Sequence, residues 1–361
     1  MSLARLGETG LIDLLSRGAP VDPDVLVGIG DDAAVVRTRP GQDLLLTCDL
    51  LHEGVHFRSS WYADRDPGLL GRKALAASIS DIACKGGLPR FCLVTLGAGQ
   101  DLTAEFLTAV FSGLYALARE HGISVVGGDT VGLAQGLLLD VFLTGEVQTG
   151  RALLRTGAQP GDLILVTGGF GLARAGLELL DKPPARAAPC GLEAAVRERA
   201  VAGQLRPPVR LAVARRLAAT GLLHAMSDTS DGLAAQVHHI CRQSGCGAIV
   251  RADAVPVDPA AVGVARACGV EPLAWALWGG EDYELIMTAP PAAQPALLAA
   301  MAGAATEGQD GRCELSLTAI GRITAPGEIL LEKEDGTTVP LDFAGYQHFR
   351  LPGEGAGEER F

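Results

Sequence analysis

The string S-D-T-S-D-G at residues 227–232 follows an apolar run at 222–226 and precedes a helical pattern of apolar residues at 233–243. An apolar run bounded by polar residues predicts a strand, and apolar residues three and four positions apart predict an amphipathic helix. The string therefore predicts two carboxylates, Asp228 and Asp231, at the point where a strand ends and a helix begins.

Three other strings place an acidic residue beside a small residue in the same way, and a fourth has a similar form. They are G-D-D at 30–32, T-C-D at 47–49, G-G-D at 127–129 and G-G-E-D at 279–282. Any one of them is more often only a turn, because Asp and Gly are common turn residues. Carboxylates at strand ends beside Gly can converge on one cleft and leave room for a ligand, so the five strings together predict a ligand site.

Asp81 lies within a predicted helix at 67–85, among alanines that we expect to be buried. A buried carboxylate needs a partner, and two alternatives carry equal weight: an arginine such as Arg72 or Arg90, or a metal ion. Oxygen ligands without nearby His or Cys favour Mg²⁺ over zinc, and Mg²⁺ typically bridges carboxylates to phosphates. The acidic strings therefore indicate how an acidic protein can bind a polyanion such as ATP.

The composition is that of a folded protein, with 48% hydrophobic and 20% charged residues. A net charge of −12 argues against nucleic-acid and membrane-surface partners, which need basic patches. The apolar stretches fall short of the ~20 residues that a membrane span needs, and the N-terminal residues do not resemble a secretory signal. The eight cysteines are dispersed without a C-x-x-C string, so we expect reduced thiols and a cytoplasmic protein.

The chain length of 361 residues predicts two domains, which we place at residues 1–149 and 150–350, followed by a disordered tail at 351–361. The boundary is set by a polar stretch punctuated by Gly and Pro just beyond residue 150. Residues 182–203 are rich in Pro, Ala and Arg and predict a connection without regular structure. The D-G string at 335–336 predicts a hairpin with a type I′ turn.

Motifs of other nucleotide-binding folds are absent or incomplete. The sequence has no G-x-x-x-x-G-K-[ST] string of a P-loop. The string G-G-F-G at 168–171 follows a predicted strand, but Arg174 stands at the third glycine position of a dinucleotide fingerprint and no acidic strand end lies ~20 residues on. His238 and His239 lack further ligands nearby, so we expect a packed or half-exposed pair.

The order of these strings resembles the thiamine-monophosphate kinase family of the aminoimidazole-ribonucleotide-synthetase-like superfamily. The matching strings lie at residues 28–34, 47–57, 73–83, 127–130, 151–155, 227–232, 279–285 and 345–349. The resemblance implies an α+β protein with two domains: an N-terminal mixed sheet that forms a β-barrel across a homodimer, and a C-terminal α/β domain. It also implies direct, Mg²⁺-assisted phosphoryl transfer from ATP to thiamine monophosphate.

The resemblance also implies a role for individual residues. The implied metal ligands are Asp32, Thr47, Asp49, Asp81, Asp129, Asp228 and Asp231, among which Asp49, Asp129 and Asp231 carry catalysis. The implied ATP contacts are Gly128, Asp129, Arg155 and Ser230, and the implied contacts to thiamine monophosphate are His56, Glu281 and Phe343. The acceptor phosphate is already anionic at neutral pH, so alignment and charge neutralisation suffice without a general base.

Four alternatives stay open: an aminoimidazole ribonucleotide synthetase-like enzyme, a selenophosphate synthetase, a hydrogenase maturase-like enzyme, and a catalytically silent nucleotide-binding paralogue. Selenophosphate synthetase resembles a case with Cys or selenocysteine in a Gly-rich N-terminal loop, whereas the first cysteine here, Cys48, falls in a predicted strand. The maturase needs a C-terminal Cys, whereas this sequence ends Glu-Glu-Arg-Phe. Clustered carboxylates repel one another without metal, which argues against a silent scaffold.

Overall fold

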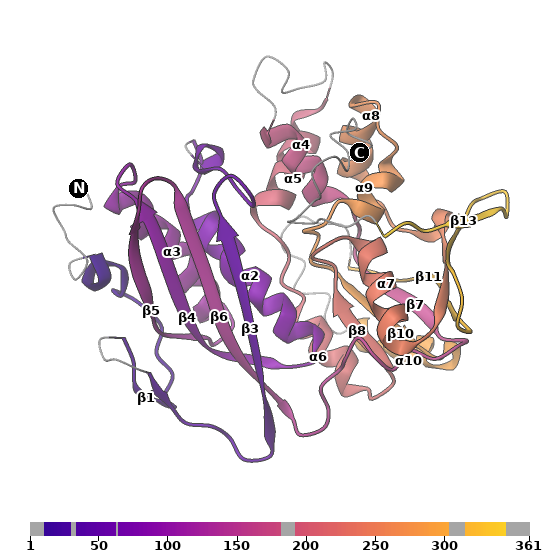
Figure 1. Cartoon of the computed structure of the whole chain (residues 1–361), viewed down its shortest axis with the longest axis horizontal. Coiled ribbons are helices and arrows are strands. Elements are labelled where there is room, and N and C mark those ends of the chain that lie inside the picture. Colours follow the sequence, from indigo (N-terminus) through magenta and orange to yellow (C-terminus); the bar gives the residue numbers. More distant parts are fainter. Residues whose placement is uncertain (1–10, 30–33, 63, 182–191, 303–314, 344–361) are drawn as a thin grey trace. The chain divides into compact units, whose positions relative to one another are not determined.

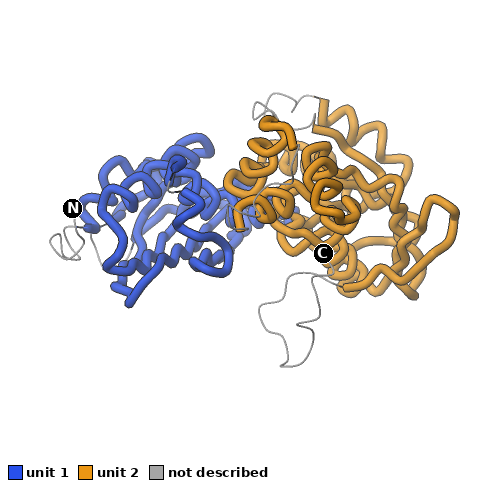
Figure 2. The backbone as a smooth tube through the Cα atoms, turned by 90° about the horizontal axis from the view of Figure 1, so that it is seen from above, with its two compact units in different colours: residues 1–152 blue, residues 153–361 orange. Residues whose placement is uncertain are grey.

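The computed structural model describes residues 11–29, 34–62, 64–181, 192–302 and 315–343, and each part of it mixes helices with strands (Figure 1). The chain divides into two compact units, residues 1–152 and 153–361 (Figure 2). Asp32 and the predicted tail lie outside the described residues.

The first unit is built on a mixed four-stranded sheet in the order β3-β6-β4-β5, in which β4 and β5 are parallel and the other neighbours are antiparallel. Two helices pack on one face of this sheet (Figure 1), and β1 pairs with β2 in a separate sheet. The bounds are β1 Val25–Val27, β2 Val35–Val36, β3 Gln42–His52, α2 Gly68–Cys84, β4 Leu88–Gly99, α3 Ala104–Glu120, β5 Ser124–Leu133 and β6 Leu137–Gln148.

The two helices of the first unit touch through glycines. The hydroxyl of Thr103 caps α3 by accepting a hydrogen bond from the amide of Phe106 at 3.2 Å. A Cβ added at Gly113 on α3 would lie 1.9 Å from the carbonyl oxygen of Gly68 on α2. The glycines therefore let the two backbones approach each other, and a side chain at Gly113 would force them apart.

The central strand β4 was not predicted from the sequence, and two acidic strings were placed wrongly at strand ends. Pro89 and the glycines near its end made β4 resemble a loop, whereas β4 pairs with β6 and β5 on its two sides. Asp129 lies inside β5 opposite Thr95, and Asp49 lies inside β3 opposite Val141. The strand β5 continues through Gly127, because glycine is also found inside strands whose backbones approach each other closely.

Gly128 marks such a close approach and allows a test. A Cβ at Gly128 would lie 1.9 Å from the carbonyl oxygen of Val94 on the neighbouring strand. We expect Gly128→Ala to lower the free energy of unfolding by about 1–3 kcal/mol, as overpacking does. Gly132→Ala on the same strand is the control, because nothing lies within 4 Å of that position. Equal urea unfolding midpoints for the two variants would contradict the steric argument.

The second unit is built on a seven-stranded sheet in the order β13-β12-β9-β11-β7-β10-β8, in which β12 and β9 are parallel and the other pairs antiparallel. The strands are β7 Leu163–Thr167, β8 Ala225–Asp228, β9 Gly247–Arg251, β10 Leu285–Ala289, β11 Leu317–Thr324, β12 Ile329–Glu332 and β13 Thr338–Pro340. The helices are α4 Leu172–Asp181, α5 Ala194–Leu205, α6 Leu211–Ala219, α7 Leu233–Ser244, α8 Pro259–Ala267, α9 Pro272–Trp278 and α10 Gln294–Ala302.

Apolar residues of two helices cover the strands of the second unit and form its main core. Ile164 and Ile286 from the sheet pack with Val237 of α7 and Leu277 of α9, all with 1% exposure or less. This core fixes the end of β8 next to the start of α7, where the first acidic string lies.

Two expectations for the second unit were wrong, and one helix was not predicted. The stretch predicted as a connection contains α5, whose Ala-rich helical segment was obscured by the Pro and Arg around it, and α9 was not predicted. The β12–β13 hairpin is present, but Gly336 has φ +80° and Asp335 lacks the positive φ of a type I′ turn. The α+β organisation in two units agrees with the expectation, and no sheet closes among the described residues. The β-barrel therefore stays a prediction.

In the described part of the chain, no single helix is long and apolar enough to cross a membrane. The pair α8 and α9 passes the same test of length and composition only when combined across a bend of 119°.

Candidate functional site

Asp228 is the last residue of β8, so the acidic string opening at residue 227 does end a strand as predicted. Its side chain is buried, with 1% exposure, whereas Asp231 is half-buried. Helix α7 begins only at Leu233, and its N-cap Gly232 makes no side-chain cap hydrogen bond. Asp228 is therefore not the N-cap of α7.

Two further predicted residues lie beside Asp228 in the second unit. The guanidinium Nε of Arg155 donates to the hydroxyl of Ser227 at 3.0 Å, and the amide of Glu281 donates to the carbonyl of Ser230 at 2.7 Å. The side chain of Ser227 and the backbone of Ser230, on either side of Asp228, thus contact Arg155 and Glu281. Arg155, Ser230 and the two acidic residues Asp228 and Glu281 therefore lie around the end of β8.

Phe343 lies against the middle of α7. Its ring is 47% exposed and packs edge-on against His238 and His239, at centroid distances of 5.4 and 5.5 Å. Burial lowers the pKa of His239, and the nearby charge of Arg155 lowers it further. The two histidines therefore form the packed, half-buried pair expected from the sequence.

A buried charged network lies behind the G-G-E-D string, and sequence analysis missed it. The guanidinium of Arg210 donates to both carboxylate oxygens of Glu284, at 2.8 and 2.5 Å, and the hydroxyl of Thr167 donates to the same carboxylate at 2.7 Å. The only signal in the sequence is Glu284, the third acidic residue after the glycines, and it does not reveal its partner.

Asp282 occupies the N-terminus of α4, where the G-G-F-G string had suggested a dinucleotide loop. Its carboxylate accepts hydrogen bonds from the amides of Gly171 at 2.8 Å and Ala173 at 3.2 Å. Burial raises the pKa of Asp282 to about 7, although these two hydrogen bonds oppose the shift. The N-terminus of α4 is thus occupied by a side chain of the same protein.

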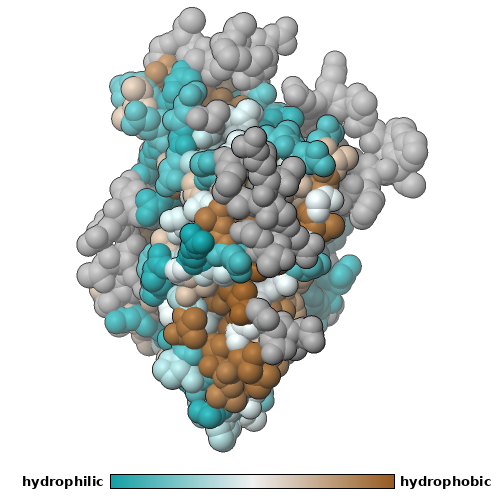
Figure 3. All heavy atoms as spheres, turned by 90° about the vertical axis from the view of Figure 1, so that its left-hand side faces the viewer, coloured by the Kyte–Doolittle hydropathy of each residue, from teal (hydrophilic) through white to brown (hydrophobic). Residues whose placement is uncertain are grey.

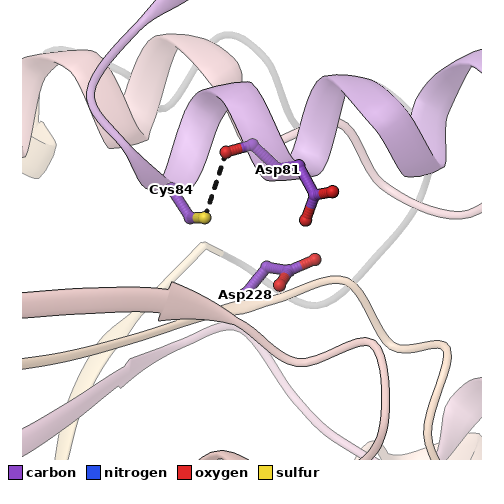
Figure 4. A group of neighbouring side chains, drawn as sticks. All are labelled: Asp81, Cys84 and Asp228. Carbon is purple, nitrogen blue, oxygen red and sulfur yellow. Dashed lines mark hydrogen bonds between the residues drawn. The ribbon is translucent and has the colours of Figure 1, made fainter. Parts of the chain in front are cut away.

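In the first unit, the hydroxyl of Thr47 on β3 donates a hydrogen bond to the carboxylate of Asp81 on α2. Asp49 follows two residues later and shares with Thr47 the sheet face that packs against α2. Figure 4 shows Asp81 on α2, where the thiol of Cys84 contacts the Asp81 carbonyl at 3.2 Å, and Asp228 at the end of β8.

The two arginines considered as partners of Asp81 are engaged elsewhere. Arg72 donates to Glu120 at 3.2 Å. Arg90 is 3% exposed and pairs with Asp24 at 2.8 Å and with Glu146 at 3.0 Å. Neither of these two arginines therefore pairs with Asp81, and the buried Arg90 instead ties the segment before β1 to the sheet.

Asp129 lies on the opposite face of the sheet from Thr47 and Asp49, since it pairs with Thr95 while Asp49 aligns with Val141. It is exposed and lines a cavity of about 710 Å³ together with Gly128. The structure therefore groups Thr47, Asp49 and Asp81 on one face and places Asp129 on the other.

His56 is half-buried in the turn after β3, where its Nδ1 accepts a hydrogen bond from the amide of His52 at 3.1 Å. On the open face of β3, the thiol of Cys48 donates to Asp140 at 3.0 Å, and this hydrogen bond raises the pKa of Cys48 to about 11. Cys48 is therefore a protonated thiol at neutral pH rather than a nucleophile.

Comparisons with known proteins cover nearly the whole chain. The models of AIR synthase related protein match residues 30–147 with the N-terminal domain and 159–329 with the C-terminal domain. The thiamine-monophosphate kinase of Escherichia coli (strain K12) is 36% identical over 332 residues, which cover 91% of this chain and 94% of the relative.

The chain belongs to the thiamine-monophosphate kinase family.

Two solved structures of this family share the fold. The thiamine-monophosphate kinase from Stenotrophomonas maltophilia K279a is 35% identical, with a TM-score of 0.73 over 92% of this chain and 98% of that chain. The structure of AaThiL complexed with AMPPCP and TMP is 30% identical, with a TM-score of 0.70 over 97% of this chain and 99% of that chain.

The residues predicted from the resemblance to thiamine-monophosphate kinases fall within the two matched ranges, except for Arg155 and Phe343. Arg155 lies in the link between the ranges, and Phe343 lies beyond the second. Arg155 contacts Ser227, the residue before Asp228, whereas Phe343 packs on His238 and His239 in the middle of α7.

Proposed function

We propose that the protein transfers the γ-phosphoryl group of ATP to thiamine monophosphate and forms thiamine diphosphate and ADP. The observation that carries the proposal is the 36% identity to a thiamine-monophosphate kinase over more than nine-tenths of both chains. The relative complexed with AMPPCP and TMP supports it, because AMPPCP stands in for ATP with a methylene group in place of the oxygen between the β- and γ-phosphates.

The proposal assigns a task to each group of side chains. Gly128, Asp129, Arg155 and Ser230 contact ATP, and the positive charge of Arg155 suits its phosphates. His56, Glu281 and Phe343 hold thiamine monophosphate, whose thiazolium ring is cationic and whose pyrimidine is flat and apolar on its faces. A carboxylate and an exposed aromatic ring suit those two properties.

The donor set fits magnesium. The grouped residues Thr47, Asp49 and Asp81 offer only oxygen atoms, and so do the carboxylates that flank Ser230. When bound, Mg²⁺ neutralises phosphate charge and so permits two polyanions to approach each other. We propose the ligands Asp32, Thr47, Asp49, Asp81, Asp129, Asp228 and Asp231, with catalytic roles for Asp49, Asp129 and Asp231.

The assay that tests the function is ADP release with and without thiamine monophosphate. We expect ADP release to depend on thiamine monophosphate and to match thiamine diphosphate formation one to one. An equal rate of ADP release with and without thiamine monophosphate would overturn the proposal and favour another ATP-using member of the superfamily.

The transfer is expected to be direct, because the acceptor oxygen is already anionic and needs no intermediate carrier. After incubation with γ-labelled ATP alone, the protein should carry no label. Label on the protein before the acceptor is added would contradict direct transfer.

We also propose that a second copy covers the open face of the first unit and completes the β-barrel. Leu44, Leu46 and Leu50 project from one face of the edge strand β3 and are 57%, 59% and 46% exposed. Hydrophobic side chains gather on this unit in Figure 3. Exposed apolar surface of this kind marks an interface.

Leu46→Asp tests the homodimer. A charge in the middle of the apolar face should convert a dimer into monomers in sedimentation velocity, because an unpaired carboxylate is costly to bury. Leu298→Asp on α10 is the control, because Leu298 is 44% exposed but belongs to the second unit. A wild-type monomer, or a Leu46→Asp dimer, would contradict the proposal.

Phe343→Ala is expected to raise the KM for thiamine monophosphate about tenfold and to leave the KM for ATP unchanged, since stacking and apolar contact are lost at one substrate. The melting temperature should change little, because the ring is 47% exposed. Phe111→Ala, which truncates a ring with 7% exposure, is the comparison for a core phenylalanine. An unchanged KM for thiamine monophosphate in Phe343→Ala would contradict the assignment.

A further inference from the structure

The turn that carries Glu281 has an unusual backbone. Gly280, Glu281 and Tyr283 have φ of +69°, +56° and +49°, and in the part of the chain that the structure describes Glu281 and Tyr283 are the non-glycine residues with positive φ. Side chains with a Cβ rarely adopt this conformation, and where they do, the surroundings must impose it. The turn is therefore held in place by contacts from outside it.

Three anchors hold the turn. The carboxylate of Asp282, 6% exposed, accepts two amide hydrogen bonds at the start of α4, as described above. The amide of Glu281 donates to the carbonyl of Ser230 at 2.7 Å, and the amide of Glu284 donates to the hydroxyl of Thr229 at 3.0 Å. Backbone and side-chain contacts thus hold the residues on both sides of Glu281. The Cα of Glu281, and with it the start of its side chain, is therefore fixed in position.

Gln204 reaches the same side chain from α5. Its Nε2 donates to Oε2 of Glu281 at 2.6 Å, and its Cβ packs so closely on α4 that a Cβ added at Gly176 would lie 2.8 Å from it. The glutamine is only 2% exposed, and among the described residues its Oε1 has no hydrogen-bond partner. A buried amide with one unpaired end costs stability, so an apolar side chain would serve packing better.

The choice of an amide matters for the charge of Glu281. An arginine or lysine at position 204 would form an ion pair with Glu281, whereas the neutral amide of Gln204 donates a hydrogen bond to the carboxylate without adding a positive charge. A carboxylate is complementary in charge to a cationic heterocycle.

We propose that Gln204 is a positioning residue that fixes the Glu281 carboxylate for the cationic acceptor, on a turn anchored by Asp282. The proposal rests on the proposed function, because that function makes Glu281 a contact to thiamine monophosphate. Gln204 itself acts through Glu281 and does not touch the substrate.

The test is a double-mutant cycle on the purified full-length protein, with Gln204→Met, Glu281→Gln and the double variant. Met has the length of Gln but no donor. We expect Gln204→Met to raise the KM for thiamine monophosphate about tenfold, to leave the KM for ATP within about twofold, and to keep or raise the melting temperature. In the Glu281→Gln background the same change should have no further effect on KM.

Other results would overturn the proposal. A KM for thiamine monophosphate within twofold of wild type in Gln204→Met would do so, as would equal increases in both KM values together with a lower melting temperature. An undiminished effect of Gln204→Met in the Glu281→Gln background would show that Gln204 does not act through Glu281.

A crystal structure of Gln204→Met tests the position of the Glu281 side chain independently of the proposed function. If wild-type protein forms no thiamine diphosphate, the proposed function fails, and the structure still decides the positioning claim. A displaced Glu281 side chain supports it, and an unmoved one overturns it. Val201→Met, a half-buried position on the same helix, controls for a new methionine in α5.

Discussion

Asp228→Asn is expected to lower kcat by about 10²–10³-fold and to raise the Mg²⁺ concentration needed for half-maximal activity. The reason is that Asn keeps the shape of the side chain but removes the negative charge that makes it a metal ligand, and electrostatic groups at a transferring phosphoryl group have effects of this size. Steady-state kinetics over a range of Mg²⁺ concentrations measure both effects.

The stability of the same variant separates metal binding from a structural role. The carboxylate of Asp228 is 1% exposed, and desolvation disfavours its charged form. Without metal, Asp228→Asn should therefore be at least as stable as wild type, while the rise in melting temperature on addition of Mg²⁺-ATP should shrink. Asp253→Asn, an exposed aspartate of the same unit, should leave every one of these quantities unchanged. Near-wild-type turnover in both Asp228→Asn and Asp231→Asn would rule out the metal mechanism.

Arg210→Met is expected to lower the free energy of unfolding by about 3–5 kcal/mol, which is the usual cost of removing one partner of a buried ion pair. The side chains of Arg210 and Glu284 are only 8% and 4% exposed, so the substitution leaves a carboxylate buried without its cation. Urea unfolding followed by circular dichroism measures the loss.

The matched control for this prediction is Arg216→Met on the same helix, because Arg216 is exposed. That substitution should cost less than about 0.5 kcal/mol, as surface substitutions usually do. Replacing both partners, in Arg210→Met with Glu284→Leu, should recover part of the loss, since no charge is then left buried alone. If Arg210→Met and Arg216→Met unfolded at the same urea concentration, the pair would contribute nothing to stability.

Local signals in the sequence were sufficient for α7 and for the end of β8. The helix α7 was recognised from the spacing of its apolar residues, and the strand before it from an apolar run bounded by polar residues. The strand β4 was missed because it is buried on both sides and lacks the alternation of apolar and polar residues that identifies half-buried strands.

The contacts that shape the candidate site were beyond local signals. Asp282 could be recognised as acidic and next to glycines, but its partners Gly171 and Ala173 are 111 and 109 residues away in the sequence. The positive φ of Glu281 is imposed by such distant contacts rather than by its own preference. Similarly, the choice between an arginine and a metal ion for Asp81 depended on where Arg72 and Arg90 find their partners.

The order of strands in the two sheets has a consequence for synthesis on the ribosome. The first sheet is made of strands that are all complete once residue 148 has emerged. In the second sheet, β7 lies between β10 and β11, both more than 100 residues later in the chain. Since domains tend to fold as units from the N-terminus onward, the first unit can fold while β7 and α4 still lack their neighbours. The apolar strand β7 then stays unpaired until nearly the whole chain has been made, and this period is when a chaperone would protect the nascent protein most.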